Sequence, residues 1–356
     1  MKILGIETSC DETSAGIVED GNKLLANIVR TQIDIHKEYG GVVPEIAARN
    51  HIDVIMPVVN QSLVKAKLNW GEIDAIAVTN GPGLMGSLLI GTLTARMLAI
   101  IHKKPLYPVH HILGHIYANW ITDKSEDRPE FPILALIVSG KHTHLFYLES
   151  HLKVKLIGET TDDAVGEAYD KVAKLIGLEY PGGPSIQKAA QGGDSKFFDL
   201  PTPKVQGKYD FSFSGPKTAV LRRTQELIGE DFRFPSWKVA ERLTKKQVQD
   251  IAASFQAKAV QILVETTKRA YNDLGTKLKP KSLIIGGGVA CNQLLRTELT
   301  KAFQNEPVKL NYSPIELCTD NGAMIAALGC FMYQYSTPED PREVKTNPNL
   351  KIAYQD

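Results

Sequence analysis

The chain has 356 residues, of which 43% are hydrophobic and 23% are charged, and this composition is typical of a folded protein with more than one core. The formal net charge of +1 excludes a chain-wide electrostatic footprint for nucleic acid. Any RNA contact must come from local basic clusters, such as Arg222-Arg223, Lys245-Lys246 and the run from Lys277 to Lys281. The four cysteines form no C-x-x-C pair and indicate no disulfide framework. With no signal-like N-terminus and no apolar run of transmembrane length in the pattern, we predict a cytoplasmic protein without membrane association.

Short strands, turns and helices alternate in the first third of the chain. The pattern predicts strands at residues 3–6, 15–18 and 23–29, a helix at 44–68, a strand at 73–78, a helix ending near 101 and a strand at 106–109. The polar turn Glu7–Ser14 is rich in hydroxyl groups that can bind a phosphate, although an ordinary solvated hairpin is the alternative. The glycine-rich turn Asn80–Ser87 precedes a helix and is either a ligand loop or a tight connection.

The segment Val109–Ile116 holds three of the nine histidines. If the segment is helical, His111 and His115 leave the same face with Cβ atoms about 5–6 Å apart, which lets two imidazoles share one metal ion. Two half-buried histidines at an interface are the alternative. A zinc metalloprotease of the H-E-x-x-H type requires a glutamate after the first histidine, and Ile112 stands there.

The polar stretch Thr122–Glu130 separates this part from a second one that repeats its order of elements. That part is predicted to hold strands at 133–138, 144–148 and 153–157, a helix at 166–177, a helix after the turn at 211–218, one or two helices over 244–274, a strand at 282–285, a helix at 293–303 and a last helix to about 333. The repetition indicates an internal duplication.

We therefore predict an α/β fold of two actin-like lobes, of the hexokinase and Hsp70 type, with a nucleotide and metal site in the cleft between them. The lobes are placed at residues 1–129 and 130–320. The final helix, at about 321–335, is free to pack back on the first lobe, and residues 336–356 are expected to be loosely ordered.

The sequence also resembles a known family, the tRNA N6-adenosine threonylcarbamoyltransferases in their bacterial form. The matching motifs occur in order from residue 4 to about 330. They are Ser9–Ser14, Asn80–Leu84, His111–His115, Gly166–Lys171, Tyr180–Pro184, Phe211–Gly215, Gly287–Asn292 and Cys318–Asn321.

The resemblance implies transfer of a threonylcarbamoyl group from threonylcarbamoyl-AMP to N6 of the adenosine beside the anticodon, in tRNAs that read ANN codons, with release of AMP. It implies that His111, His115 and Asp320 hold one divalent metal ion, expected to be Fe(2+) with zinc as the alternative. Two imidazoles and a carboxylate also suit a facial triad with open positions on chemical grounds. ATP, ADP and AMP are expected to fit the same nucleotide site.

Further site residues also follow from the resemblance. The turn Ile137-Val138-Ser139-Gly140-Lys141 is similar to the family's phosphate and acyl-adenylate loop, and Asp170, Gly183 and Asn292 are similar to its adenosine contacts. Two departures stand out, because Lys141 replaces a usual glycine and Gln187 replaces a usual aspartate.

Asp11 is the candidate base for the reaction, because the aromatic amine of adenine is a poor nucleophile. Orientation of metal-bound waters and a turn-stabilising cap are the alternatives for this residue. The implied partners are tRNA, the paralogue TsaB and the ATPase TsaE, and a homodimer is left open. An actin-like small-molecule kinase and a non-enzymatic ATP-binding scaffold are the other functional alternatives.

Overall fold

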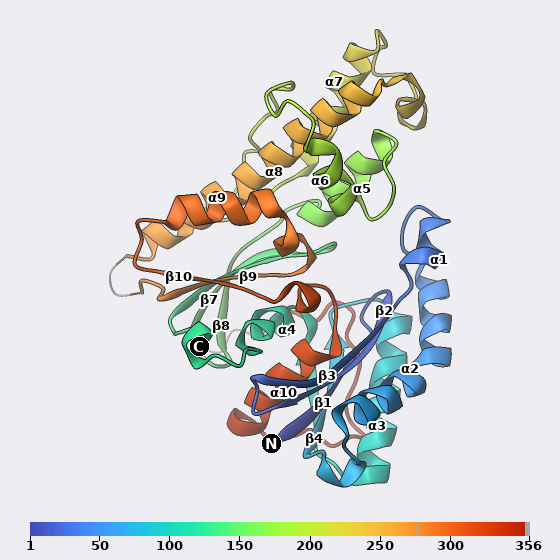
Figure 1. The fold of residues 1–356 in the computed structure, drawn as a ribbon, viewed down its shortest axis with the longest axis vertical. Coiled ribbons are helices and arrows are strands. Elements are labelled where there is room, and N and C mark those ends of the chain that lie inside the picture. Colours follow the sequence, from blue (N-terminus) through green and yellow to red (C-terminus); the bar gives the residue numbers. More distant parts are fainter. Residues whose placement is uncertain (276–277, 353–356) are drawn as a thin grey trace.

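A computed structural model describes residues 1–275 and 278–352 of the chain. Its described residues form two five-stranded sheets (Figure 1). The first sheet contains β1 (Lys2–Glu7), β2 (Glu12–Glu19), β3 (Lys23–Thr31), β4 (Ala75–Gly81) and β5 (Leu106–His110). The second contains β6 (Ile133–Val138), β7 (Thr143–Ser150), β8 (Lys153–Glu159), β9 (Ser282–Gly286) and β10 (Lys309–Tyr312).

The two sheets have the same topology. The strand order is β3-β2-β1-β4-β5 in one and β8-β7-β6-β9-β10 in the other. In each sheet the first three strands are antiparallel and the last two join in parallel. The predicted α/β duplication is therefore confirmed. The sequence pattern missed β10, because a four-residue strand of mixed polarity has too little periodicity to be recognised.

Helices connect the strands of each lobe. They are α1 (Ile33–Lys37), α2 (Pro44–Ala66), α3 (Met85–His102), α4 (His111–Tyr117), α5 (Val165–Leu175), α6 (Gly182–Ala190), α7 (Ser214–Leu227), α8 (Lys245–Asp273), α9 (Gln293–Phe303) and α10 (Gly322–Tyr335). The region 244–274 is a single helix, α8, which begins with a capping box between Thr244 and Gln247. Helix α6, which the sequence pattern did not predict, begins inside the motif Tyr180–Pro184, with Pro184 in its first turn, where a missing N–H costs little.

The last helix of the chain packs on the first sheet. Glycines on β1 and β2 make this approach possible, because a Cβ atom at Gly16 would lie 2.3 Å from the backbone nitrogen of Ala323. Helix α4 also contacts α10 and the second-sheet strands β6 and β9. One hydrophobic cluster consequently joins the lobes and includes Ile112, Ile137 and Ile325.

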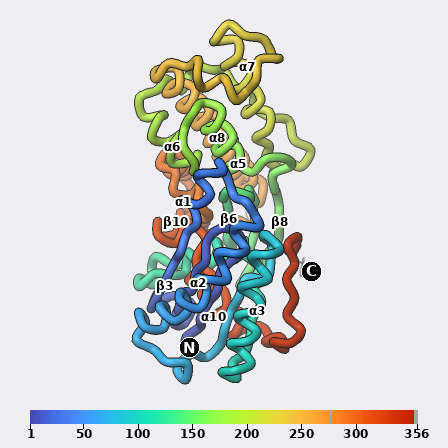
Figure 2. Tube along the Cα trace, turned by 90° about the vertical axis from the view of Figure 1, so that its right-hand side faces the viewer, coloured from blue at the N-terminus to red at the C-terminus, as the bar shows by residue number. Residues whose placement is uncertain are grey.

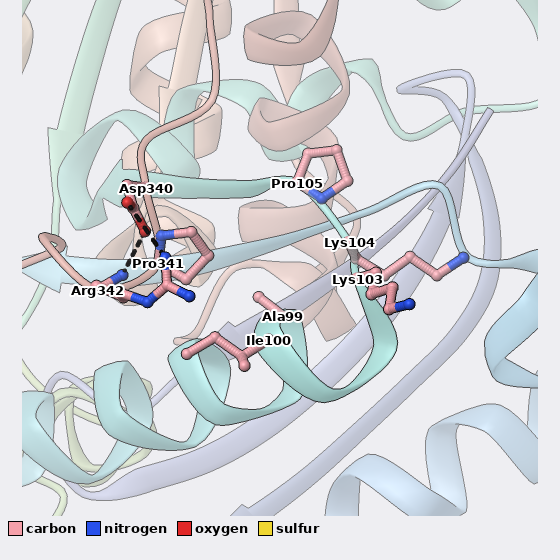
Figure 3. Close-up of a pocket in the computed structure, with 8 residues that line it drawn as sticks. All are labelled: Ala99, Ile100, Lys103, Lys104, Pro105, Asp340, Pro341 and Arg342. Carbon is pink, nitrogen blue, oxygen red and sulfur yellow. Dashed lines mark hydrogen bonds and ion pairs between the residues drawn. The ribbon is translucent and has the colours of Figure 1, made fainter.

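The tail is ordered as far as it is described, contrary to the expectation of a loose segment. Val344 is fully buried, the Glu339 amide donates to the Leu106 carbonyl, and the Asn347 amide donates to the Asn80 carbonyl. Asp340, Pro341 and Arg342 lie beside α3 (Figure 3), and the tail runs along that helix (Figure 2). Polar composition did not predict this order, because backbone hydrogen bonds and one buried valine hold the segment. Residues 353–356, also part of the predicted tail, lie outside the described residues.

Helix α3 combines a buried face with an exposed apolar face. Within the described residues it is the one helix long and apolar enough to cross a membrane by length and composition alone, and 39% of it is buried in the protein. The sequence pattern did not single out this helix as a continuous apolar run, because Ser87, Thr94 and Arg96 interrupt its apolar residues. The helix is apolar all round because one face packs on β4 and α2 while Leu89, Met97 and Ile101 face outward.

Candidate active site

A cavity of about 880 Å³ lies between the two lobes, and we call it the inter-lobe cavity. Its first-lobe wall comes from the β1–β2 turn, the turn after β4 and the start of α4, and its second-lobe wall comes from the β6–β7 turn and the ends of α5, α6 and α9. Nine residues expected at the site line it: Asp11, His111, Ser139, Gly140, Lys141, Asp170, Gly183, Asn292 and Asp320. Ile137 and Val138 do not line it, because both side chains of this strand are fully buried in the core. His115 lies behind His111 and is 1% exposed.

The histidine segment forms a helix as expected, and Asp320 meets it from far along the chain. The ligand atoms of His111, His115 and Asp320 lie within 4.8 Å of one another. The Asp320 Oδ1 atom is 3.6 Å from His111 Nε2 and 3.2 Å from His115 Nε2. Apart from its contact with Asp320, the buried Nε2 atom of His115 has no polar partner among the described residues, and its lone pair is available to a metal ion. Two imidazoles and a carboxylate beside the inter-lobe cavity are a donor set that fits one divalent metal ion.

Close packing between α4 and α10 sets the position of these ligands. Gly114, between the two histidines, faces α10 so closely that a Cβ atom there would lie 2.9 Å from Ile325 Cδ1. Asn321 caps α10 by accepting a hydrogen bond from the Met324 amide at 2.9 Å. Asp320 directly precedes this cap, and its backbone position is therefore fixed by the start of the helix.

Glu7, at the end of β1, supports the metal-ligand cluster and was not selected from the sequence. Its fully buried Oε2 atom lies 3.1 Å from His111 Nδ1 and accepts a hydrogen bond from Thr79, while Oε1 accepts one from the Ser9 amide. A carboxylate on Nδ1 fixes the ring orientation and leaves Nε2 directed at Asp320. The available signal was a charged residue at the end of the apolar run 3–6, where burial requires a partner.

The charged groups of this cluster shift one another's pKa values. Burial would lower the pKa of His111, but the carboxylates of Asp320 and Glu7 outweigh it and raise the pKa to about 9. Burial would likewise raise the pKa values of Glu7 and Asp320, but His111 is the main opposing cause, and both pKa values lie below the usual range. The metal-free cluster therefore pairs an imidazolium with two carboxylates.

Lys141 reaches across the cleft from the second lobe to the first. Its Nζ atom lies 3.1 Å from the Sγ atom of Cys10. Burial, followed by the charge of Asp11, raises the pKa of the Cys10 thiol well above its usual value, so the thiol is neutral. No carboxylate in the described part of the chain forms an ion pair with Lys141. An ammonium that forms no ion pair and lies at the wall of a cavity can attract an anionic group of a ligand.

Two of the expected adenosine contacts on the second-lobe wall, Asp170 and Asn292, form hydrogen bonds within the protein. Asp170 accepts a hydrogen bond from the Gly182 amide at 2.7 Å, and burial raises its pKa to about 6. Asn292 caps α9 through the Leu295 amide and donates to Gln256. The space beside Gly183 is open.

Gln187, the residue in place of the usual aspartate, also lines the inter-lobe cavity. Its Oε1 atom accepts a hydrogen bond from the Gln293 amide at 2.8 Å. The amide oxygen thus accepts a hydrogen bond from the first residue of α9, and the NH₂ group remains available to donate to a ligand hydroxyl.

Asp11 lines the inter-lobe cavity on the first-lobe side and is 7% exposed. In residues 1–275 and 278–352, no hydrogen bond joins its carboxylate to a backbone group, and this argues against the turn-capping alternative. Beside it, burial and then the charge of Asp11 raise the pKa of Glu12 well above its usual value. The Glu12 carboxyl therefore keeps its proton to a higher pH than an ordinary glutamate does.

The duplicated topology and the site between the lobes define an actin-like two-lobed protein. Solved structures agree on the fold: HypF from T. kodakarensis matches with a TM-score of 0.60 and 14% identity, over 95% of this chain and 49% of that chain. Full-length HypF in the phosphate- and nucleotide-bound form matches with a TM-score of 0.57 and 12% identity, over 94% of this chain and 46% of that chain.

Sequence comparison identifies the family. The family profile described as TsaD, tRNA N6-adenosine threonylcarbamoyltransferase, matches residues 23–327. The proteins of that name from Thermomicrobium roseum and Staphylococcus epidermidis are 47% and 48% identical to this chain. These matches cover 96% and 93% of this chain, and 94% and 92% of the relatives. The chain belongs to the tRNA N6-adenosine threonylcarbamoyltransferase family.

Proposed function

We propose that this protein transfers the threonylcarbamoyl group from threonylcarbamoyl-AMP to N6 of the adenosine beside the anticodon, in tRNAs that read ANN codons, and releases AMP. Family membership supports the reaction. The observation that carries the proposal is the cluster of His111, His115 and Asp320 at the wall of a cavity large enough for an acyl-adenylate. Neither a kinase nor a protease accounts for this cluster, since Ile112 stands where a protease needs its glutamate.

One divalent ion would be held by His111, His115 and Asp320, with Fe(2+) as the proposed ion and zinc as the alternative. When bound, the ion supplies Lewis-acid stabilisation of charge on the carbonyl or the leaving phosphate. The protein itself fixes the positions of the side chains that would bind the ion. Glu7 and Ser9 orient the His111 ring from behind, and Glu7 balances the positive charge of the site.

The substrate would contact residues of both lobes. The Ser139 hydroxyl, the open backbone at Gly140 and the Lys141 ammonium would bind the phosphate. Asp170, Gly183 and Asn292 would line the nucleoside side, where ATP, ADP or AMP fit equally. The Asp170 carboxylate keeps acceptor capacity for a hydroxyl beyond its bond with Gly182.

Asp11 would act as the base for the attacking amine. Its carboxylate faces the inter-lobe cavity, and it would accept a proton from N6 as the new C–N bond forms and the bond to the AMP oxygen breaks. AMP then leaves as a phosphate monoester, and the Lys141 charge would stabilise the negative charge that develops on it.

The test is single-turnover transfer. Labelled threonylcarbamoyl-AMP, unmodified tRNA, the iron-loaded protein and its companion proteins are mixed, with wild type beside His111→Ala and the control His102→Ala. His102 stacks on Trp70 outside the cavity. We expect label on tRNA adenosine with wild type and His102→Ala, and a loss of more than about 100-fold with His111→Ala, since even outer-sphere changes cost 10- to 100-fold. Unchanged transfer by His111→Ala would remove the metal from the mechanism. No transfer by wild type, with companions competent toward another family member, would contradict the function itself.

An exposed apolar surface on the first lobe would serve a companion protein. We define the α2–α3 patch as Ile52, Val64, Leu89, Leu93, Met97 and Ile101, all of which are exposed. Exposed aliphatic side chains on two helices that pack together are typical of a protein interface. We propose that the paralogue TsaB binds this patch, and we assign no surface to TsaE. Co-purification with TsaB is expected to be lost in Leu93→Asp and retained in Lys153→Asp. If size-exclusion chromatography instead shows that Leu93→Asp converts a dimer to a monomer, the patch serves self-association.

A further inference from the structure

A segment of the second lobe presents large aromatic side chains to solvent. It comprises residues 230–242, between α7 and α8, and we call it the aromatic segment. It is held in place by hydrogen bonds from Gln225 to the Phe234 carbonyl at 2.8 Å and from Arg222 to the Phe232 carbonyl at 3.1 Å, and Val239 is fully buried beneath it. Its exposed side chains therefore stand on an ordered base.

Two aromatic rings on this segment are largely exposed to solvent. Phe232 is 65% exposed and Trp237 is 77% exposed. The guanidinium groups of Arg222 and Arg233 lie 5.9 and 5.4 Å from the centre of the Phe232 ring. Large exposed rings among cations are costly to keep in water and are typical of surfaces that stack on bases.

The charge around the rings is positive. Residues 222–246 include seven basic and four acidic side chains, in a chain whose net charge is +1. Arg222, Lys238 and Lys245 are exposed and form no ion pair among the described residues. Arg223 and Arg233 form surface ion pairs, which contribute little and leave the arginines available. This composition attracts a polyanion.

The aromatic segment borders a loop that reaches the inter-lobe cavity. A Cβ atom at Gly177 would lie 3.0 Å from the Cβ atom of Ala240, so the segment packs on the end of α5. Three residues later in the same loop, Tyr180 lines the cavity. The segment lies at the end of the molecule far from the N-terminus (Figures 1 and 2). An RNA with one base in the cavity would extend well beyond it. Neighbouring nucleotides of that RNA could therefore reach the aromatic segment.

We propose that the aromatic segment binds unpaired nucleotides of the tRNA substrate, with Trp237 and Phe232 stacking on bases and Arg222, Lys238 and Lys245 contacting phosphates. This inference rests on the proposed function. An RNA loop fits better than a protein partner, because protein interfaces are depleted in lysine, whereas rings flanked by arginine and lysine suit single-stranded RNA. The aliphatic α2–α3 patch, which has a different composition, suits a protein. Of the basic run from Lys277 to Lys281, Lys277 lies outside the described residues.

The test is the binding of an unmodified tRNA transcript to the full chain, measured by fluorescence anisotropy at several salt concentrations. Trp237→Ala and, separately, Phe232→Ala are expected to weaken binding about 10-fold. The double variant Lys238→Ala/Lys245→Ala is expected to reduce the slope of log affinity against log salt by about 1 to 2. Tyr335→Ala, an exposed ring on α10, and Lys153→Ala are the matched controls and are expected to bind like wild type. AMP binding should be equal in all variants, which also reports that each is folded.

Three results would overturn the inference. If wild type transfers the label but the aromatic variants bind tRNA normally, the surface has another role and the proposed function stands. If the variants keep tRNA binding and lose a companion protein, the surface is a protein interface. If wild type neither binds tRNA nor transfers the label, the proposed function and this inference both fail.

Discussion

In the first lobe, the last strand of the sheet leads into α4, which carries His111 and His115. At the equivalent point of the second lobe, after β10, the chain carries Asp320 and then α10. Each half of the duplication thus places candidate metal ligands after its fifth strand. The helices then diverge, because α4 lies between the sheets and α10 crosses to pack on β1 and β2.

The equivalent hairpins also diverge. The β1–β2 turn supports the ligand cluster through Glu7 and Ser9, whereas the β6–β7 turn offers an open glycine and the Lys141 ammonium to the inter-lobe cavity. Two copies of one topology therefore carry different chemistry. The first lobe holds most of the proposed metal site, and the second lobe adds one proposed ligand and the wall that we propose binds the phosphate.

The largest effect is expected where α10 crosses between lobes. Gly16→Ala would place a Cβ atom 2.3 Å from the Ala323 nitrogen, and backbone cannot move aside as a side chain can. We expect a loss of about 3 kcal/mol in the free energy of unfolding, measured by urea denaturation. Gly215→Ala, with nothing near its Cβ position, is the control and should lie within about 1 kcal/mol of wild type. Equal stability of both variants would show that α10 does not depend on this contact.

The support of the first-lobe ligands is tested by Glu7→Gln. An amide keeps the shape of the side chain but removes the charge that polarises His111. Metal affinity, measured by competition with a chelator, should fall about 10- to 100-fold. Glu19→Gln, on the same pair of strands and ion-paired with Lys23 at the surface, should leave it unchanged. If Glu7→Gln also binds the metal normally, Glu7 has only a structural part.

Protonation gives a third test of the cluster. With a pKa of about 9 in the metal-free protein, His111 is protonated at neutral pH and must lose this proton to bind a metal. The apparent metal affinity should therefore rise with pH, by about tenfold per unit below pH 9, and level off above it. Calorimetry in buffers of different ionisation enthalpy should show about one proton released near pH 7. Binding without proton release would contradict the charged pairing of His111 with Glu7 and Asp320.

The smallest effect is expected on the second-lobe wall. Lys141→Met should weaken AMP binding about fivefold to tenfold, because one charged contact to phosphate is lost at an exposed position. Adenosine, which has no phosphate, should bind equally to both proteins. Lys153→Met is the control for removing a lysine. An equal loss for adenosine and AMP would mean that Lys141 shapes the loop and does not bind the phosphate.

Local sequence patterns predicted most of the elements. Apolar runs located nine of the ten described strands, and the spacing of His111 and His115 placed both on one face of α4. The repeated order of strands and turns predicted the duplication, since strand and helix periodicities depend on neighbours within a few residues. The short strand β10 and the helices α1 and α6 were missed, because segments this short or rich in Gly and Pro carry weak periodic signals.

Tertiary structure decided the remainder of the site. Glu7, Thr79, His111 and Asp320 come from distant parts of the chain, and the residues alone do not show that a carboxylate at the end of β1 lies 3.1 Å from an imidazole on α4. Their meeting depends on how closely two sheets and two helices pack, which glycines at 5, 16 and 114 permit. The tail likewise became ordered through backbone hydrogen bonds to β5 and the turn after β4.

By itself, then, the sequence determined the duplicated α/β elements, the helical histidine pair and the motifs of the family, because each depends on residues close together in the chain. Only the tertiary structure decided that α10 returns to the first lobe, that Glu7 supports His111, and that Lys141 faces a neutral thiol across the cleft. These features depend on packing and electrostatics between distant segments, which local periodicity does not encode.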